Sequence, residues 1–122
     1  MHQLWKKLVL PGIILLMLDF IYISSTKSMF ENQIIEIQRV ALNVKTSGAI
    51  ACYVFLIFGL YYFILRTRRS ILDAFLLGIV IYGVYETTSY ALLKKWKPSI
   101  VLMDTLWGGV LFGLTTAVSY AL

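Results

Sequence analysis

Three carboxylate residues lie inside long apolar stretches of the sequence. Asp104 occurs in VLMDTLWGG (101–109), Asp19 in LMLDFIYI (16–23) and Glu86 in IYGVYETTS (81–89). A carboxyl group in apolar surroundings can bind a cation or carry a proton. Carboxyl groups that are close together in low dielectric cannot all ionise, so they share protons and titrate as a set. If these residues meet in the fold, their chemistry suits proton coupling.

The composition indicates the elements that would position these residues. The 122 residues are 60% hydrophobic and 14% charged, with a mean hydropathy of +0.82, whereas a soluble domain is about half apolar and a quarter charged. Segments of ~17–25 apolar residues span a bilayer as helices. Four blocks meet this length, and we predict an all-α integral membrane protein with one four-helix membrane domain (1–122) in contact with the lipid bilayer. The predicted spans are residues 5–23, 48–65, 71–93 and 99–122.

The first block also has one feature of a cleaved signal peptide, because Lys6 and Lys7 precede an apolar run. However, Asp19 interrupts that run and no Ala-x-Ala-type cleavage site follows it. We therefore expect a transmembrane helix here.

The longest connection, residues 24–47, predicts an amphipathic helix between spans 1 and 2. Ser28-x-x-Glu31 has the spacing of a capping box. Apolar residues then recur at helical spacing, at Phe30, Ile34, Ile37, Ala41 and Val44. This helix either lies on the bilayer surface or extends a spanning helix. The alternative is a helix that binds a partner.

The two shorter connections carry helix-start signals. Ser70 and Asp73 have the spacing of an N-cap and the third helical residue, so we interpret Asp73 as a helix-start carboxylate and exclude it from any functional site. Pro98 and Ser99 predict the start of the last helix. Trp96 is expected to be an aromatic anchor at the membrane interface.

The basic residues give no clear orientation. We call side A the face with the N-terminus, the second connection and the C-terminus, and side B the face with the first and third connections. Side A carries five basic residues and side B carries six. Such a near tie is expected of a dual-topology protein, and it also occurs in proteins with a single orientation.

Residue spacing places the three acids at one depth. Asp19, Glu86 and Asp104 each lie about five to seven residues from the side-B end of their helix, which is roughly 7–11 Å at 1.5 Å per residue. An ionisable residue inside a span costs about 2.5–3.5 kcal/mol, so these acids should face the bundle interior. They are our candidates for a cation- or proton-binding site. The polar residues expected to support them are Tyr22, Tyr53, Tyr82, Tyr85, Ser89 and Trp107.

The acid layer has two interpretations. In the structural one, the acids pair with hydroxyl groups or with lysines that reach down from the interface, and so set the helix register. The donors would come from Tyr22, Tyr53, Tyr82, Tyr85, Thr87, Lys94 and Lys95. In the functional one, the acids line a polar cavity that opens to side B.

The sequence does not favour an enzyme. His2 is the only histidine, Cys52 is the only cysteine, and neither a Ser-His-Asp set nor the motifs of intramembrane aspartic proteases are present. Nothing in the spacing requires a metal ion, so we expect neither a metal site nor a cofactor. The basic residues flank the spans, where they meet lipid headgroups, so a nucleic-acid partner is not expected either.

Small residues on the last predicted helix indicate close helix packing. Gly109 and Gly113 form a Gly-xxx-Gly pair within a stripe of small residues, and Gly108 lies on the face of Asp104. The stripe either packs within the monomer or forms a homo-oligomer interface.

The last 49 residues carry a family resemblance. Gly78, the Tyr82-Gly83-x-Tyr85 run, Trp96 and Asp104-x-x-Trp107-Gly108 resemble a family of small predicted membrane proteins, domain of unknown function 2177, and 18-LDFIY-22 is similar to its Leu-Asp-x-x-Trp element. Glu86, Ser89 and Tyr22 stand where the family usually has Asp, Asn and Trp. The resemblance implies a four-span membrane protein and no particular activity.

Two hypotheses about function follow. The first is a small proton- or cation-coupled transporter or channel subunit, as a homo-oligomer, with Asp19, Glu86 and Asp104 lining a cavity on side B. The second is a non-catalytic structural, assembly or accessory subunit of a larger membrane complex, in which the acid layer only holds the bundle together.

Overall fold

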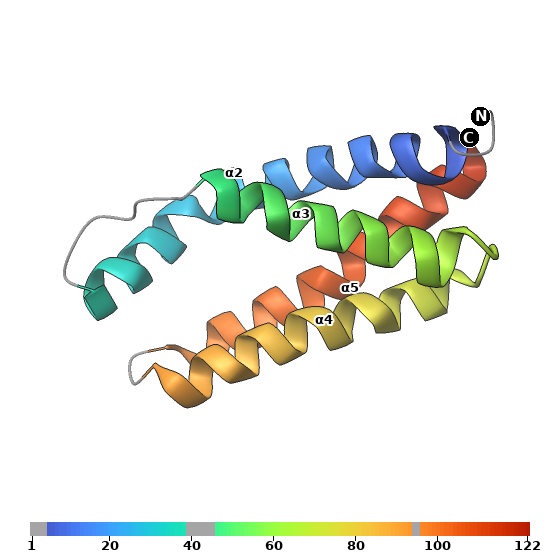
Figure 1. Ribbon diagram of the computed structural model, residues 1–122. Coiled ribbons are helices and arrows are strands. Elements are labelled where there is room, and N and C mark those ends of the chain that lie inside the picture. Colours follow the sequence, from blue (N-terminus) through green and yellow to red (C-terminus); the bar gives the residue numbers. More distant parts are fainter. Residues whose placement is uncertain (1–4, 39–45, 94–95) are drawn as a thin grey trace.

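The protein is an all-α bundle of long apolar helices (Figure 1). The computed structural model describes residues 5–38, 46–93 and 96–122. Four helical stretches are long and apolar enough to cross a membrane: Lys7–Met29, Thr46–Leu65, Ile71–Leu92 and Pro98–Ala121. The predicted fold class is therefore confirmed. The elements are η1 (Trp5–Val9), α2 (Leu10–Gln38), α3 (Thr46–Leu60), η2 (Tyr61–Leu65), α4 (Ile71–Leu92) and α5 (Pro98–Ala121).

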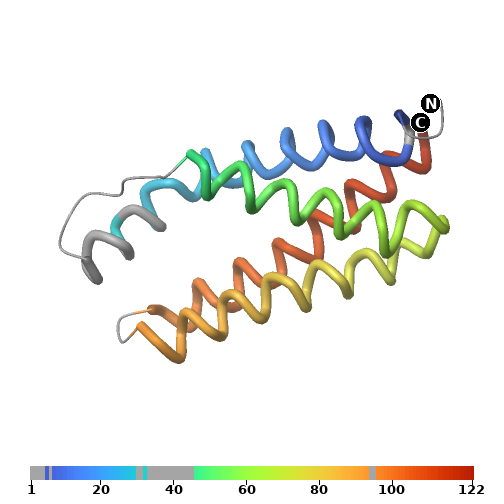
Figure 2. The backbone as a smooth tube through the Cα atoms, viewed as in Figure 1, coloured from blue at the N-terminus to red at the C-terminus, as the bar shows by residue number. Residues whose placement is uncertain are grey.

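The described elements meet at side A through polar contacts to one turn. Figure 2 shows the start of η1, the turn between η2 and α4, and the end of α5 at the same end of the bundle. Lys7 Nζ donates to the carbonyl oxygen of Arg66 at 3.2 Å, and the Tyr120 hydroxyl donates to that of Arg69 at 2.6 Å. The turn thus joins the first and last spans.

The first spanning helix continues well beyond the predicted span. α2 ends at Gln38, and its 29 residues correspond to about 43 Å, longer than the ~30 Å hydrocarbon layer. The connection therefore begins as an extension of span 1, one of the two arrangements expected for it. The predicted helix start at Ser28 is wrong, because Ser28 lies inside α2. The end of the predicted amphipathic helix, Ala41 and Val44, lies outside the described residues.

The predicted starts of the last two helices are confirmed. The Ser70 side chain accepts a hydrogen bond from the Asp73 backbone N–H at 3.0 Å, and Asp73 also accepts from Arg69 Nε at 3.0 Å. α5 begins at Pro98, which lacks the N–H that the first helical turn leaves unpaired.

α4 and α5 form the most closely packed helix pair. A Cβ atom at Gly78 would lie 2.1 Å from the carbonyl oxygen of Gly108. One at Gly108 would lie 2.3 Å from the ring of Tyr82. Gly109 and Gly113 of the small-residue stripe face Ile79, Phe75 and Ile71 of α4. The two glycines of the stripe thus pack against α4 within the monomer.

α3 packs less closely against the other helices than α4 and α5 pack against each other. It lies beside α2, and Figure 1 shows it diverging from α4 after the turn that joins η2 to α4. Its buried residues and those of η2 point into an apolar core with residues of α2, α4 and α5. The core consists of Leu15, Leu56, Leu60, Ile64, Leu65, Ala74, Leu111 and Phe112. Most large side chains on the outer face of α3 are exposed, as a lipid-facing surface requires.

Candidate functional site: a buried carboxylate layer

Asp19, on α2, connects three helices. Its side chain is 5% exposed. The Tyr53 hydroxyl of α3 donates to Asp19 Oδ2, and the Trp107 indole N–H of α5 donates to Oδ1 at 3.0 Å. Each carboxylate oxygen thus has its own donor, as a buried charged or polar group requires.

Asp104, on α5, is paired with a tyrosine of α2. The Tyr22 hydroxyl donates to Asp104 Oδ1 at 3.0 Å, and Asp104 is 7% exposed. The Tyr22 ring also stacks on the Trp107 ring, with centroids 4.5 Å apart and the planes nearly parallel. These hydrogen bonds thus have donors on both helices. Tyr22 of α2 donates to an acid on α5, and Trp107 of α5 donates to an acid on α2.

Glu86, on α4, is the most deeply buried acid, with no exposed surface. The Trp96 indole N–H, just before α5, donates to Glu86 Oε1 at 2.9 Å. The other oxygen, Oε2, is buried and lacks a donor among the described residues. The carboxyl group of Asp104 lies nearby on α5.

These contacts form one continuous layer, which we call the acid layer. It runs from Tyr53 through Asp19, the Trp107–Tyr22 stack, Asp104 and Glu86 to Trp96. The structure therefore brings together all three acids that residue spacing placed at one depth. In the part of the chain that the structure describes, each of the three acids is buried, whereas a polar cavity open to side B would expose them.

The remaining residues expected to support the acids make other contacts. Tyr82 covers Gly108 with its ring, and Tyr85 is exposed. Ser89 is half-buried, and its backbone carbonyl caps the end of α4 by accepting from the Leu93 N–H. The Thr87 hydroxyl bonds the carbonyl of Gly83 within its own helix. Lys94 and Lys95, which were possible donors, lie outside the described residues.

Trp96 makes a contact that sequence reasoning did not predict. Its side chain is only 6% exposed and hydrogen-bonds Glu86, so it packs into the bundle. The signal available in the sequence was its position ten residues after Glu86, across a short connection that returns the chain to the same end of the bundle. Tryptophan carries only one donor, so a buried tryptophan near an acid is a natural partner for it.

The acid layer does not resemble a metal centre. Among the residues that the structure describes, no group of three or more His, Cys, Asp or Glu side chains is placed to hold a metal ion. The donors that surround the acids are hydroxyl and indole groups, which pair with carboxylates by hydrogen bonding.

The fold is that of a four-span integral membrane protein. Its buried carboxylates accept hydrogen bonds from tyrosine and tryptophan side chains. The family follows from comparison. Residues 4–121 match the family described as "Predicted membrane protein (DUF2177)". The chain belongs to this family, which confirms the resemblance seen in its sequence. No curated protein and no solved structure matches it.

Proposed function

We propose that this protein is a non-catalytic structural, assembly or accessory subunit in the membrane, in which the acid layer holds the helices in register. The observation that supports this proposal is the closure of the layer. Each acid is less than a tenth exposed and accepts a hydrogen bond from an aromatic side chain on another part of the chain. A transport site needs access from at least one side.

Hydrogen bonds specify register because apolar contacts in lipid do not. Lipid tails are as apolar as leucine, so the helices gain little from hiding apolar surface from lipid, and polar pairs and close packing decide their arrangement. Tyr53 attaches the loosely packed α3 to Asp19, and Trp107 attaches Asp19 to α5. Sliding either helix by one residue would leave a buried carboxylate oxygen without its donor.

A liposome assay tests this proposal. Purified wild-type protein and Asp104→Asn are reconstituted, and proton and cation flux are followed with pH- and ion-sensitive dyes. We expect no flux above that of empty liposomes from either protein, together with a lower unfolding midpoint for Asp104→Asn. Asp73→Asn is the matched control, because its carboxylate lies in the ion pair at side A. Wild-type flux that disappears in Asp104→Asn would overturn the proposal.

The proposed role as a subunit has its own test. Tagged wild-type protein extracted in a mild detergent should migrate as a complex larger than its own micelle, with other membrane proteins in stoichiometric amounts. Migration as a bare monomer under conditions that preserve other membrane complexes would contradict this role.

A second candidate, proton coupling, is supported by one observation: Glu86 Oε2 is buried and has no hydrogen-bond partner among the described residues, and Asp104 lies nearby. In this proposal the Glu86–Asp104 pair holds one proton. Its release would leave two negative charges in contact in low dielectric, and their repulsion would open the layer towards side B.

Glu86→Gln separates the two candidates. The amide has nearly the shape of the carboxyl group, and its NH₂ group can donate to Asp104 without a titrating proton. Under the structural proposal, Glu86→Gln is as stable as wild type and neither conducts protons. Under the proton-coupling proposal, wild type conducts protons and Glu86→Gln folds but does not.

A further inference from the structure

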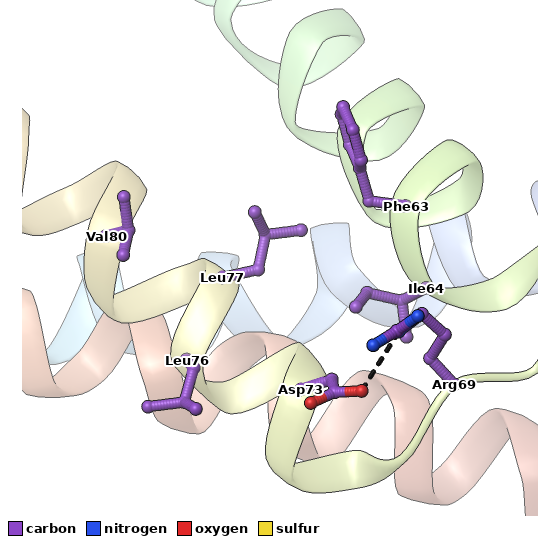
Figure 3. A pocket seen from close by; sticks show the side chains of 7 residues that line it. All are labelled: Phe63, Ile64, Arg69, Asp73, Leu76, Leu77 and Val80. Atoms are coloured by element: carbon purple, nitrogen blue, oxygen red, sulfur yellow. Dashed lines mark hydrogen bonds and ion pairs between the residues drawn. The ribbon is translucent and has the colours of Figure 1, made fainter.

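A groove lies on the outside of the bundle at side A, and none of the acid-layer residues lines it. It is lined by side chains of η2, α4 and the turn between them and has a volume of about 400 Å³ (Figure 3). Five of the seven lining residues are apolar: Phe63, Ile64, Leu76, Leu77 and Val80. Since α3 and α4 diverge from the turn that precedes α4, the groove opens between two spanning helices.

The described residues leave the apolar walls of the groove uncovered. Phe63, Leu76 and Val80 are all exposed, while Ile64 at the base is buried. In a spanning segment, such a surface faces the hydrocarbon layer. The groove is therefore positioned to receive an acyl chain of a membrane lipid.

The polar end of the groove is positively charged. Arg69 and Asp73 form an ion pair there at 3.0 Å, shown dashed in Figure 3. Arg66 and Arg68 belong to the same turn, so this part of the chain carries three arginines and one carboxylate, and its net charge is positive. Arg69 donates to Asp73 through Nε, and a guanidinium group has five N–H donors, so this ion pair leaves donor capacity for a second anion.

The turn holds its arginines in defined places. The Arg66 guanidinium lies 4.3 Å from the centre of the Tyr62 ring, and that of Arg68 lies 4.4 Å from the centre of the Tyr120 ring. Arg68 itself has a φ of 53°, in the left-handed region that residues with a side chain seldom adopt. Lys7 adds a further positive charge beside the Arg66 carbonyl.

We propose that this groove binds one anionic phospholipid, with an acyl chain along Phe63, Leu76 and Val80 and its phosphate at Arg69. The charge at the polar end selects the headgroup, because arginine recognises phosphate through several parallel N–H donors. Asp73 opposes the same phosphate, so it limits affinity. This proposal is independent of the function of the acid layer.

Native mass spectrometry of the detergent-solubilised protein tests the proposal. Phosphatidylglycerol and phosphatidylcholine of identical acyl composition are titrated separately, and the population of the one-lipid adduct is measured. We expect phosphatidylglycerol to bind more tightly than phosphatidylcholine, as a saturable single adduct. Equal affinities for the two lipids would overturn the assignment of the headgroup site.

Three variants identify the site. Arg69→Gln should weaken phosphatidylglycerol binding about fivefold to tenfold and leave phosphatidylcholine unchanged. Asp73→Asn should tighten phosphatidylglycerol binding up to about fivefold, an effect that the loss of a purely structural ion pair would not produce. Val80→Trp fills the groove without changing charge and should weaken both lipids.

Lys27→Gln is the matched control, since it removes one exposed positive charge from α2, outside the residues that line the groove. It should leave both affinities unchanged. Equal losses in Lys27→Gln and Arg69→Gln would show attraction by net charge alone and would overturn the proposal, as would unchanged binding in Val80→Trp.

Discussion

The α4–α5 pair and the attachment of α2 and α3 are two different solutions to helix association in lipid. Between α4 and α5, glycines bring the backbones together, with Gly78 directly on the Gly108 peptide. Between α2, α3 and α5, the principal specific contacts are hydrogen bonds from Tyr53, Tyr22 and Trp107 to two aspartates. One interface depends on shape and the other on donors and acceptors.

Because of this difference, we expect substitutions in the two interfaces to destabilise the protein to different extents. A close backbone approach has no flexible part, so an added methyl group forces one helix away from the other. A hydrogen bond in the acid layer can lose one partner and keep the other helix contacts. We therefore expect packing variants in the first interface to cost more than polar variants in the second.

The largest effect is expected for Gly78→Ala. The new Cβ would meet the Gly108 carbonyl at 2.1 Å, a backbone atom that moves only with its helix. We expect the free energy of unfolding in mixed micelles to fall by about 3 kcal/mol. Gly59→Ala is the control, because its Cβ would meet nothing within 4 Å, and it should change stability by less than about 1 kcal/mol. Equal effects of the two variants would refute the close contact.

Asp19→Ala should have the next largest effect. It leaves the Tyr53 hydroxyl and the Trp107 indole N–H without their acceptor, and hydrogen bonds of this kind contribute about 0.6–1.7 kcal/mol each in membranes. We expect a loss of about 2 kcal/mol. Asp19→Asn retains one acceptor oxygen, so it should lose about half as much. If both variants lose the same amount, the two donors do not contribute separately.

Trp96→Phe tests the outer end of the acid layer. Phenylalanine keeps an aromatic ring but removes the indole N–H that pairs with Glu86 Oε1. We expect a loss of about 1 kcal/mol in the same unfolding measurement. Trp5→Phe, at an exposed position in η1, is the control and should have no measurable effect. A neutral Trp96→Phe would show that its hydrogen bond does not stabilise the layer.

Ser70→Ala should have the smallest effect, because it touches neither interface. It removes the N-cap of α4, whose side chain accepts from the Asp73 N–H, and should cost about 0.5–1 kcal/mol. Ser25→Ala is the control: Ser25 bonds the Ile21 carbonyl within α2, and its loss should leave stability unchanged. An effect of Ser70→Ala as large as that of Asp19→Ala would reverse the ranking of local and interhelical contacts.

Much of the fold could be predicted because each element has a local cause. Apolar run length predicts the spans, and the Ser70–Asp73 spacing predicts a cap that the structure contains. The predicted helix start at Ser28 was wrong for a physical reason. A capping sequence starts no new helix when the residues before it are already helical, and α2 runs through Ser28 to Gln38.

The sequence predicted which acids belong to the candidate site, but it did not predict which donor hydrogen-bonds each acid. Helical rise places Asp19, Glu86 and Asp104 near one level, and the structure brings them together. Which donor meets which acid depends on side-chain direction and helix rotation, which residue counting does not provide. The contact of Trp96 with Glu86 was missed for this reason, and so was the burial of all three acids.

The sequence by itself determined that the chain spans a membrane four times and that its acids lie at a common depth, because span length and helical rise are properties of the local chain. Only the tertiary structure decided which contacts the side chains at that depth make. Helix rotation placed aromatic donors against the carboxylates, left Glu86 Oε2 without a hydrogen-bond partner among the described residues, and turned the glycines of α5 towards α4. These outcomes depend on how separate helices face one another, and no single segment encodes that.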